Sequence, residues 1–138
     1  MLEASLVARL RHEFRGMSWV TYEEVPFLHQ RIDLVAVEPS TDALVAIEAK
    51  VKNWRVAVGQ ALSSLLCCDY VYIALPEGRV QVVDLDHVRG LGIGVISVGR
   101  DVIKVLDPPA SRIRDPYHAE SLRGMLQVMG ANLDEGDR

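Results

Sequence analysis

Two short apolar runs on either side of a turn constrain the fold of this chain more than any other feature. Residues 34–37 (Leu-Val-Ala-Val) and 44–47 (Leu-Val-Ala-Ile) are continuous apolar segments, and residues 38–42 between them have turn chemistry. A connection of this length suits an antiparallel hairpin. Strands without polar alternation are typically buried on both faces, so we expect an α/β fold with a mixed central sheet flanked by helices.

The elements around this hairpin extend the pattern. Asn53 is a good N-cap for a following helix, and a strand, a helix and a strand in succession predict a right-handed parallel crossover. The predicted elements of the first half are a helix at 2–14, a strand at 18–25 that Pro26 interrupts, strands at 31–37 and 43–50, a helix at 54–68 and a strand at 70–75.

The 138 residues suggest one domain with a sizeable core. We expect residues 1–76 to form its main part, residues 77–130 to add a β-hairpin and a helix, and residues 131–138 to fray. The elements predicted for the second half are a short helix at 82–89, a hairpin of strands at 92–98 and 102–106, and a terminal helix at 117–129.

The acidic residues of the first hairpin suggest its chemistry. If the strands pair symmetrically about the turn, Asp33 lies opposite Glu48, and Arg31 lies opposite Lys50. Two adjacent carboxylates repel each other unless a cation lies between them, and Mg²⁺ or Mn²⁺ suits such oxygen ligands. Lys50 could then orient an attacking water and stabilise charge on a scissile phosphate. The pattern therefore favours metal-dependent phosphodiester hydrolysis.

A structural explanation stands beside this one. Acids and lysines at strand ends often form ion pairs on a solvated face, and such pairs contribute little to stability. The apolar neighbours of Asp33 and Glu48 argue against it, because unpaired charges are costly on buried strands. A structural acid-base cluster in an unrelated α/β protein is the alternative, and a structure without the crossover after Lys50 would support it.

Glu13 is a further candidate ligand, on the N-terminal helix. It projects into the apolar stripe of this helix near its C-terminus, where desolvation and the helix dipole both disfavour a charge, so a metal would explain its position. The predicted stripe consists of Leu2, Leu6, Val7, Leu10 and Phe14. Glu3 also points into this stripe, but at the first turn the helix dipole explains it. Glu23 and Glu24 on the first strand are rival acids that we expect on a solvated edge.

Taken together, these motifs resemble the PD-(D/E)xK nuclease superfamily, which includes restriction endonucleases and Holliday-junction resolvases. The resemblance covers about residues 1–76, from the first helix through Ile32-Asp33 and Ile47-Glu48-Ala49-Lys50 to the strand that ends at Pro76. It implies a restriction-endonuclease-like core with the order αβββαβ. Ile32 stands where the name of the family has proline, and Ser64 stands where one branch has tyrosine.

The resemblance also implies roles for individual residues. Asp33 and Glu48 would bind Mg²⁺ or Mn²⁺, and Lys50 would be the catalytic lysine. Glu13 matches the first-helix acid that many members add to the metal site. Gln60 is similar to the glutamine that some branches place on the following helix, so it joins the catalytic set.

The expected substrate is DNA, although the net charge of −4 does not by itself favour a nucleic-acid binder. We expect a homodimer, because two strands require two cuts. With no apolar run long enough to span a membrane and no signal-peptide pattern, we expect a cytoplasmic protein. A catalytically silent nuclease-fold module that binds DNA or a protein is the second hypothesis. The expected contacts to the DNA backbone are the basic residues Arg31, Lys52, Arg55, Arg112 and Arg114.

Overall fold

The computed structural model describes residues 2–136, with side chains through residue 130. In chain order the elements are α1 Glu3–Gly16, β1 Val20–Phe27, β2 Gln30–Val37, β3 Leu44–Ala49, α2 Trp54–Ala61, a 3₁₀ segment Leu62–Leu66, β4 Tyr70–Pro76, a 3₁₀ segment Glu77–Val82, α3 Leu85–Gly90, β5 Gly94–Val98, β6 Val102–Leu106 and α4 Pro116–Gly136.

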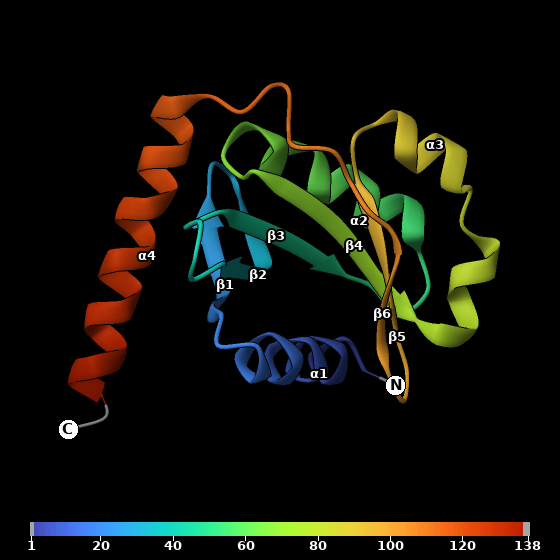
Figure 1. Cartoon of the computed structure of the whole chain (residues 1–138), viewed down its shortest axis with the longest axis horizontal. Helices are drawn as coiled ribbons and strands as arrows, with labels where there is room; N and C mark the ends of the chain where they lie inside the picture. Colours follow the sequence, from blue (N-terminus) through green and yellow to red (C-terminus); the bar gives the residue numbers. More distant parts are fainter. Residues whose placement is uncertain (1, 137–138) are drawn as a thin grey trace.

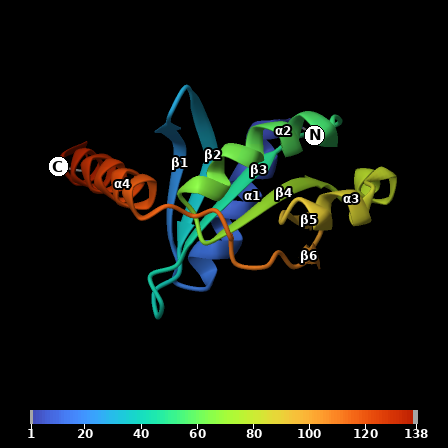
Figure 2. The ribbon, with the colours of Figure 1, turned by 90° about the horizontal axis from the view of Figure 1, so that it is seen from above.

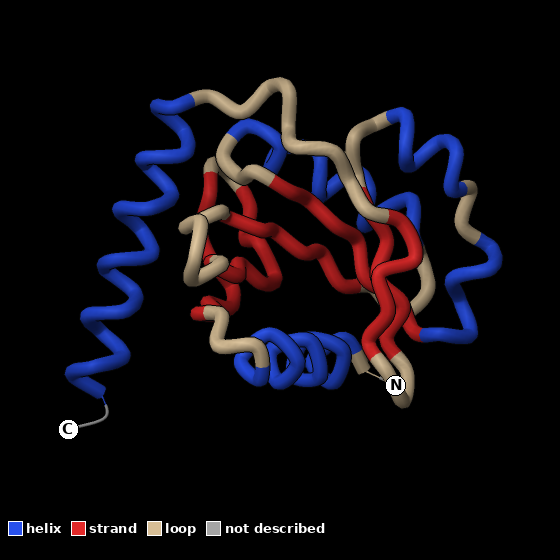
Figure 3. Tube along the Cα trace, viewed as in Figure 1, coloured by secondary structure: helices blue, strands red, loops and turns tan. Residues whose placement is uncertain are grey.

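The six strands form one mixed sheet in the order β1-β2-β3-β4-β5-β6 (Figure 3). Strand β2 is antiparallel to both of its neighbours, β1 and β3; β4 and β5 run parallel to β3, and β6 returns antiparallel to β5. The parallel pairing of β3 with β4 confirms the predicted crossover through α2. The hairpin predicted from the strands at 92–98 and 102–106 is also confirmed, because β5 and β6 pair antiparallel.

Helices cover both faces of the sheet, as the apolar hairpin predicted (Figures 1 and 2). On one face, the α1-side core, Leu6, Leu10 and Phe14 are buried against β2–β5. On the other face, the α2-side core, Trp54 of α2 and Leu122 of α4 pack together with the sheet. The chain is therefore a mixed α/β protein with helices on both faces of the sheet.

The central hairpin has the register that symmetry about its turn predicted. Leu34 pairs with Ile47, and Val37 pairs with Leu44. This register depends on the turn at 38–42, which helix α4 supports: Arg123 donates hydrogen bonds to the Asp42 carboxylate at 2.9 Å and to the Asp42 carbonyl at 2.7 Å.

The end of β1 and the start of α1 differ from the prediction. Strand β1 does not end before Pro26, because Pro26 pairs with Arg31 and the strand continues to Phe27. An edge strand tolerates proline, since it needs ladder hydrogen bonds on one side only. Leu2 is not part of the apolar stripe, because α1 begins at Glu3 and leaves Leu2 74% exposed.

The second half contains more helix than the sequence indicated. The short helix predicted at 82–89 corresponds to α3, Leu85–Gly90, and an additional 3₁₀ segment, Glu77–Val82, precedes it. The N-terminus of α3 is capped by Asp84, whose side chain accepts a hydrogen bond from the His87 N–H. Helix α4 extends past Met129 to Gly136, and the end of the tail expected to fray lies outside the described residues. No helix within residues 2–136 is both long and apolar enough to cross a membrane.

Candidate functional site

Asp33 and Glu48 lie side by side where the β2–β3 ladder ends. They occupy the next position in the register after the pair Leu34 and Ile47. At this point the Asp33 side chain accepts a hydrogen bond from the Ala49 N–H at 2.8 Å. The carboxylate of β2 is therefore held against β3, as the pairing argument predicted.

A local irregularity aims Asp33 in this direction. Ile32 packs into the α2-side core, whereas Leu34 packs into the α1-side core. In a regular strand these two residues would share a face, so the alternation of side-chain faces along β2 is interrupted and the strand rolls at Asp33. The neighbouring strand β1 is also irregular at this level. Glu24 lies opposite Asp33, between two regular cross-strand pairs, and its φ is +52°. Backbone in the left-handed region is costly for a residue other than glycine and often marks a functional site.

Glu48 is the buried member of the pair. Its side chain is 1% exposed, and its Oε1 atom has no hydrogen-bond partner among the residues that the structure describes. Burial, with the neighbouring Asp33 charge as second cause, raises the pKa of Glu48 from 4.5 to about 9, and Lys50 opposes this shift. Without a cation beside it, this carboxyl is protonated at neutral pH.

Lys50 directly follows β3 and lies next to this pair. Its N–H donates to the Ala74 carbonyl at 3.1 Å, which keeps its backbone on the β4 side. Its Nζ atom lies 3.5 Å from Oε1 of Glu3, the first residue of α1. Sequence reasoning assigned Glu3 to the helix dipole and missed this contact. The signal that could have found it was its position in the apolar stripe.

Two hollows adjoin at Glu3. One, of about 590 Å³, lies between the start of α1 and the segment from Lys50 to Val56. The other, of about 550 Å³, lies between α1 and strands β1 and β2, and its charged lining consists of Glu3, Arg11, Glu23, Glu24 and Asp33. Arg11 neutralises Glu23 through an ion pair of 2.7 Å. Substrate-sized space thus exists on both sides of the Glu3–Lys50 contact.

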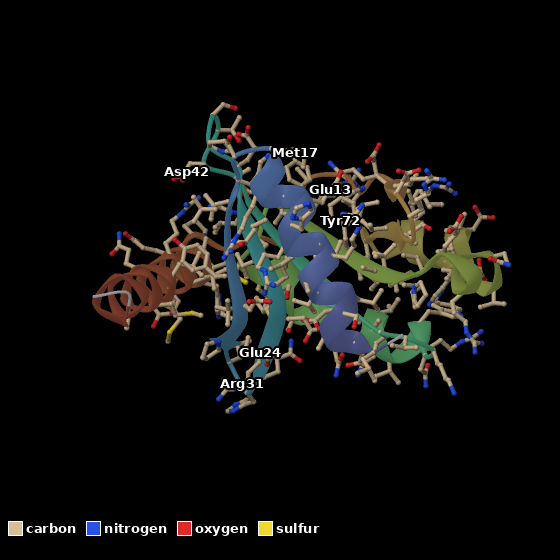
Figure 4. The ribbon with its side chains drawn as sticks, turned by 90° about the horizontal axis from the view of Figure 1, so that it is seen from below. Glu13, Met17, Glu24, Arg31, Asp42 and Tyr72 are labelled. Atoms are coloured by element: carbon tan, nitrogen blue, oxygen red, sulfur yellow. The ribbon has the colours of Figure 1, made fainter. Side chains whose placement is uncertain are left out.

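The structure does not bring Glu13 to Asp33 and Glu48. Glu13 pairs with Arg9 at 3.2 Å and lies at the Met17 end of α1, whereas Glu24 lies toward the other end (Figure 4). Ten residues separate Glu13 from Glu3, which is roughly 15 Å along a helix. The helical arc describes the direction of a side chain about the helix axis, but not its position along the sheet.

Gln60 is half-buried on α2, on the side of Gln30. The contact that places it runs through its backbone, since the Gln60 carbonyl accepts a hydrogen bond from the Gln30 side chain at 2.8 Å. Its predicted catalytic role therefore stays a prediction.

The basic residues predicted to contact DNA divide between two ends of the sheet. Lys52 and Arg55 are exposed close to Lys50, and the Arg55 guanidinium lies 4.3 Å from the centre of the Trp54 ring. Arg31 lies at the same end as Glu24 (Figure 4).

Arg114 lies at the opposite end of the sheet. It pairs at 3.2 Å with Asp69, whose carboxylate accepts from the N–H of Leu44 at the start of β3. Arg112, two residues earlier, is exposed on the same connection. These two arginines are therefore not neighbours of Asp33 and Glu48.

The donor set offers two adjacent carboxylates rather than three. Within the described side chains, no group of three His, Cys, Asp or Glu residues is arranged to hold a metal ion. The predicted set of Glu13, Asp33 and Glu48 is accordingly not assembled, although Asp33 and Glu48 are.

No protein-family model and no curated protein matches the sequence. A solved structure of a protein of unknown function from Silicibacter pomeroyi superposes with a TM-score of 0.72 at 19% identity, covering 96% of this chain and 88% of that chain. A repair endonuclease from Pyrococcus abyssi gives a TM-score of 0.48 at 19% identity, covering 79% of this chain and 49% of that chain. The first similarity shows that the mixed α/β fold is shared with another protein.

Proposed function

We propose that this protein is a metal-dependent nuclease of the PD-(D/E)xK type that hydrolyses phosphodiester bonds in DNA. The observation that carries the proposal is the buried, unpartnered Oε1 atom of Glu48 beside Asp33. The order of the elements supports it: a helix, three antiparallel strands, a helix and a parallel strand.

The residues present fit a divalent cation. Two carboxylates with one unpartnered oxygen are a typical start for a Mg²⁺ or Mn²⁺ site, which fills its remaining positions with water and substrate phosphate. A cation between Asp33 and Glu48 would lower the pKa of Glu48 and give its Oε1 atom a partner. When bound, the ion would supply Lewis-acid stabilisation of charge on the phosphate.

The roles of the protein's own groups follow from their contacts. The Ala49 N–H fixes one oxygen of Asp33, so this carboxylate is already oriented before substrate binds. Lys50 is the group that would orient the attacking water and stabilise negative charge as the phosphate reacts. Glu3 restrains Lys50 in a hollow open to solvent and acts as a positioning residue.

The surroundings support a nucleic-acid substrate at this end of the sheet. Lys52 and Arg55 are exposed and follow Lys50 closely in the chain, and Arg31 is exposed at the same end as Glu24; all three would contact the phosphate backbone. We further propose that the protein acts as a homodimer, since cutting both strands of a duplex requires two such sites.

Cleavage assays with Mn²⁺ test the proposal. The substrates are supercoiled plasmid, a branched DNA, single-stranded DNA and RNA, and the proteins are the wild type, Lys50→Ala and Arg89→Ala. Arg89 is an exposed basic residue on α3, paired with Asp86, and serves as a charge-matched control. We expect cleavage by the wild type and Arg89→Ala and none by Lys50→Ala. Equal activity of Lys50→Ala would overturn the assignment.

The second candidate is a nuclease-fold module that binds DNA without cutting it. The observation that favours it is the engagement of Lys50 by Glu3, together with a donor set of only two carboxylates. Metal-independent DNA binding by the wild type, without cleavage of any substrate in Mg²⁺ or Mn²⁺, would support this candidate over the first.

A further inference from the structure

A pocket of about 260 Å³ opens at the other end of α1, away from Glu3. The chain has two Phe, two Trp and four Tyr residues, and half of these eight side chains line this pocket. They come from α1, the α1–β1 connection and β4: Phe14, Trp19, Tyr70 and Tyr72. Such a concentration of aromatic rings in a chain with so few calls for an explanation.

The rings form a floor and two walls. Phe14 and Tyr72 are buried in the floor, at 2% and 5% exposure, and Figure 4 shows Tyr72 toward the Glu13 end of α1. Trp19 and Tyr70 are partly exposed and form the walls, and the rings of Phe14 and Trp19 lie 5.0 Å apart between centroids. Aromatic walls with one face open to solvent are suited to stack against a planar ligand.

The rim of the pocket carries one charge of each sign. Lys104 of β6 and Asp107 after it are both exposed. The Lys104 Nζ atom lies 5.8 Å from the centre of the Tyr72 ring, at the outer limit of a cation–π contact, so this flexible side chain can yield to a ligand. Asp107 is an acceptor for an amino group, and Lys104 is a donor for a carbonyl or phosphate oxygen.

The backbone at this pocket has no room for a larger residue. A Cβ atom at Gly94 would come within 2.7 Å of the Tyr72 ring and 2.6 Å of the Pro108 side chain. Burial, followed by the charge of Asp107, raises the pKa of Tyr72 to about 12. The glycine thus lets β5 approach the floor ring closely.

We propose that this pocket binds a single unstacked nucleobase. The base would stack against Trp19 and Tyr70 and present its exocyclic amine to Asp107, and the phosphate of the same nucleotide would lie near Lys104. The volume is slightly below the range of about 300–1,000 Å³ for drug-sized ligands, which suits one base rather than a stack.

This site is separate from Asp33 and Glu48 and does not depend on the proposed nuclease activity. The pocket includes Val45, at the beginning of β3, whereas Ala49 at the end of β3 contacts Asp33. Four residues of strand separate them, which is roughly 13 Å. The base could belong to a free nucleotide or to a nucleic-acid strand, and the two sources are distinguished by experiment.

Calorimetric titration with adenosine 5′-monophosphate, a single-stranded oligodeoxyadenylate and choline chloride tests the proposal. Tyr70→Ala removes a partly exposed wall, and Asp107→Asn removes the rim acceptor charge without changing its shape. Tyr117→Ala is the matched control, because Tyr117 is 77% exposed on α4 and away from the pocket. Circular dichroism verifies that each variant is folded.

We expect the wild type to bind one or both adenine ligands, with at least tenfold weaker binding for Tyr70→Ala and Asp107→Asn and unchanged binding for Tyr117→Ala. Binding of the mononucleotide identifies a free nucleotide as sufficient, whereas binding of the oligonucleotide alone identifies a strand. The proposal is overturned if neither adenine ligand binds at millimolar concentration, if choline binds more tightly than both, or if Tyr70→Ala binds like the wild type.

Discussion

The Asp33 carboxylate accepts the hydrogen bond of the Ala49 N–H at 2.8 Å, just beyond the last backbone pair of β2 and β3. One oxygen of this side chain thus has a structural role, and the other is available for the proposed metal binding. The strand rolls at this residue, so the contact depends on local backbone geometry as well as on register.

Asp33→Asn separates the structural role of this side chain from its proposed role as a metal ligand. An asparagine oxygen can still accept from Ala49, so we expect the variant to fold, but one negative charge beside Glu48 is lost. Divalent-metal affinity in calorimetry should fall at least tenfold, and cleavage should fall at least a hundredfold. Asp86→Asn, an exposed change on α3, is the control. An unaltered metal isotherm for Asp33→Asn would remove Asp33 from the site.

Glu48 gives the metal-free protein a particular pH dependence. Its pKa is raised to about 9 in the folded state from 4.5, so the folded state binds more protons between these values. Stability is then highest below pH 4.5 for this group and decreases as pH rises toward 9, by at most about 1.4 kcal/mol per pH unit.

Denaturant unfolding from pH 5 to 9 in a chelator measures this slope. Glu48→Gln cannot titrate and should flatten the profile, and Mn²⁺ should flatten it for the wild type. A Glu48→Gln profile parallel to that of the metal-free wild type would show that Glu48 does not have the raised pKa.

Glu3→Gln and Glu13→Gln form a matched pair on one helix. Glu3 contacts Lys50, whereas Glu13 contacts Arg9 toward the other end of α1. We expect Glu3→Gln to reduce kcat severalfold and to shift the pH–rate profile, because Lys50 loses its restraining charge. Glu13→Gln should leave both unchanged. The reverse outcome would restore Glu13 as the acid that α1 contributes.

Glu24→Gly tests whether the bend beside Asp33 is strained. Glycine adopts the +52° φ of this residue without a side-chain clash, so we expect the free energy of unfolding to rise by up to about 1 kcal/mol. Glu23→Gly, the neighbouring change, should lower it, because the ion pair with Arg11 is lost. Chemical denaturation of both variants gives the comparison.

Much of the first half could be predicted, since it depends on local patterns. The turn at 38–42 has a definite centre, and that centre fixed which residues face each other across the hairpin. The roll at Asp33 was not predictable, because no residue type there requires it: Glu24 takes up a backbone conformation that glycine would normally occupy.

The error over the first helix has a different physical cause. Helical periodicity gives only the direction of a side chain about the helix axis, and both Glu3 and Glu13 fall within the broad arc of the apolar stripe. Which of them meets Lys50 depends on how far α1 slides along the sheet, and this is decided by the packing of Leu6, Leu10 and Phe14. Sequence pattern contains no information on that translation.

The two hydrogen bonds that Arg123 donates to Asp42 link the C-terminal helix to the geometry of the candidate site. The turn that contains Asp42 sets the alignment of β2 with β3, and a slip of one residue would turn the Asp33 and Glu48 side chains to opposite faces. Helix α4, the most distant segment in the sequence, therefore helps to keep the two carboxylates side by side, because it stabilises the turn that sets the register of β2 and β3.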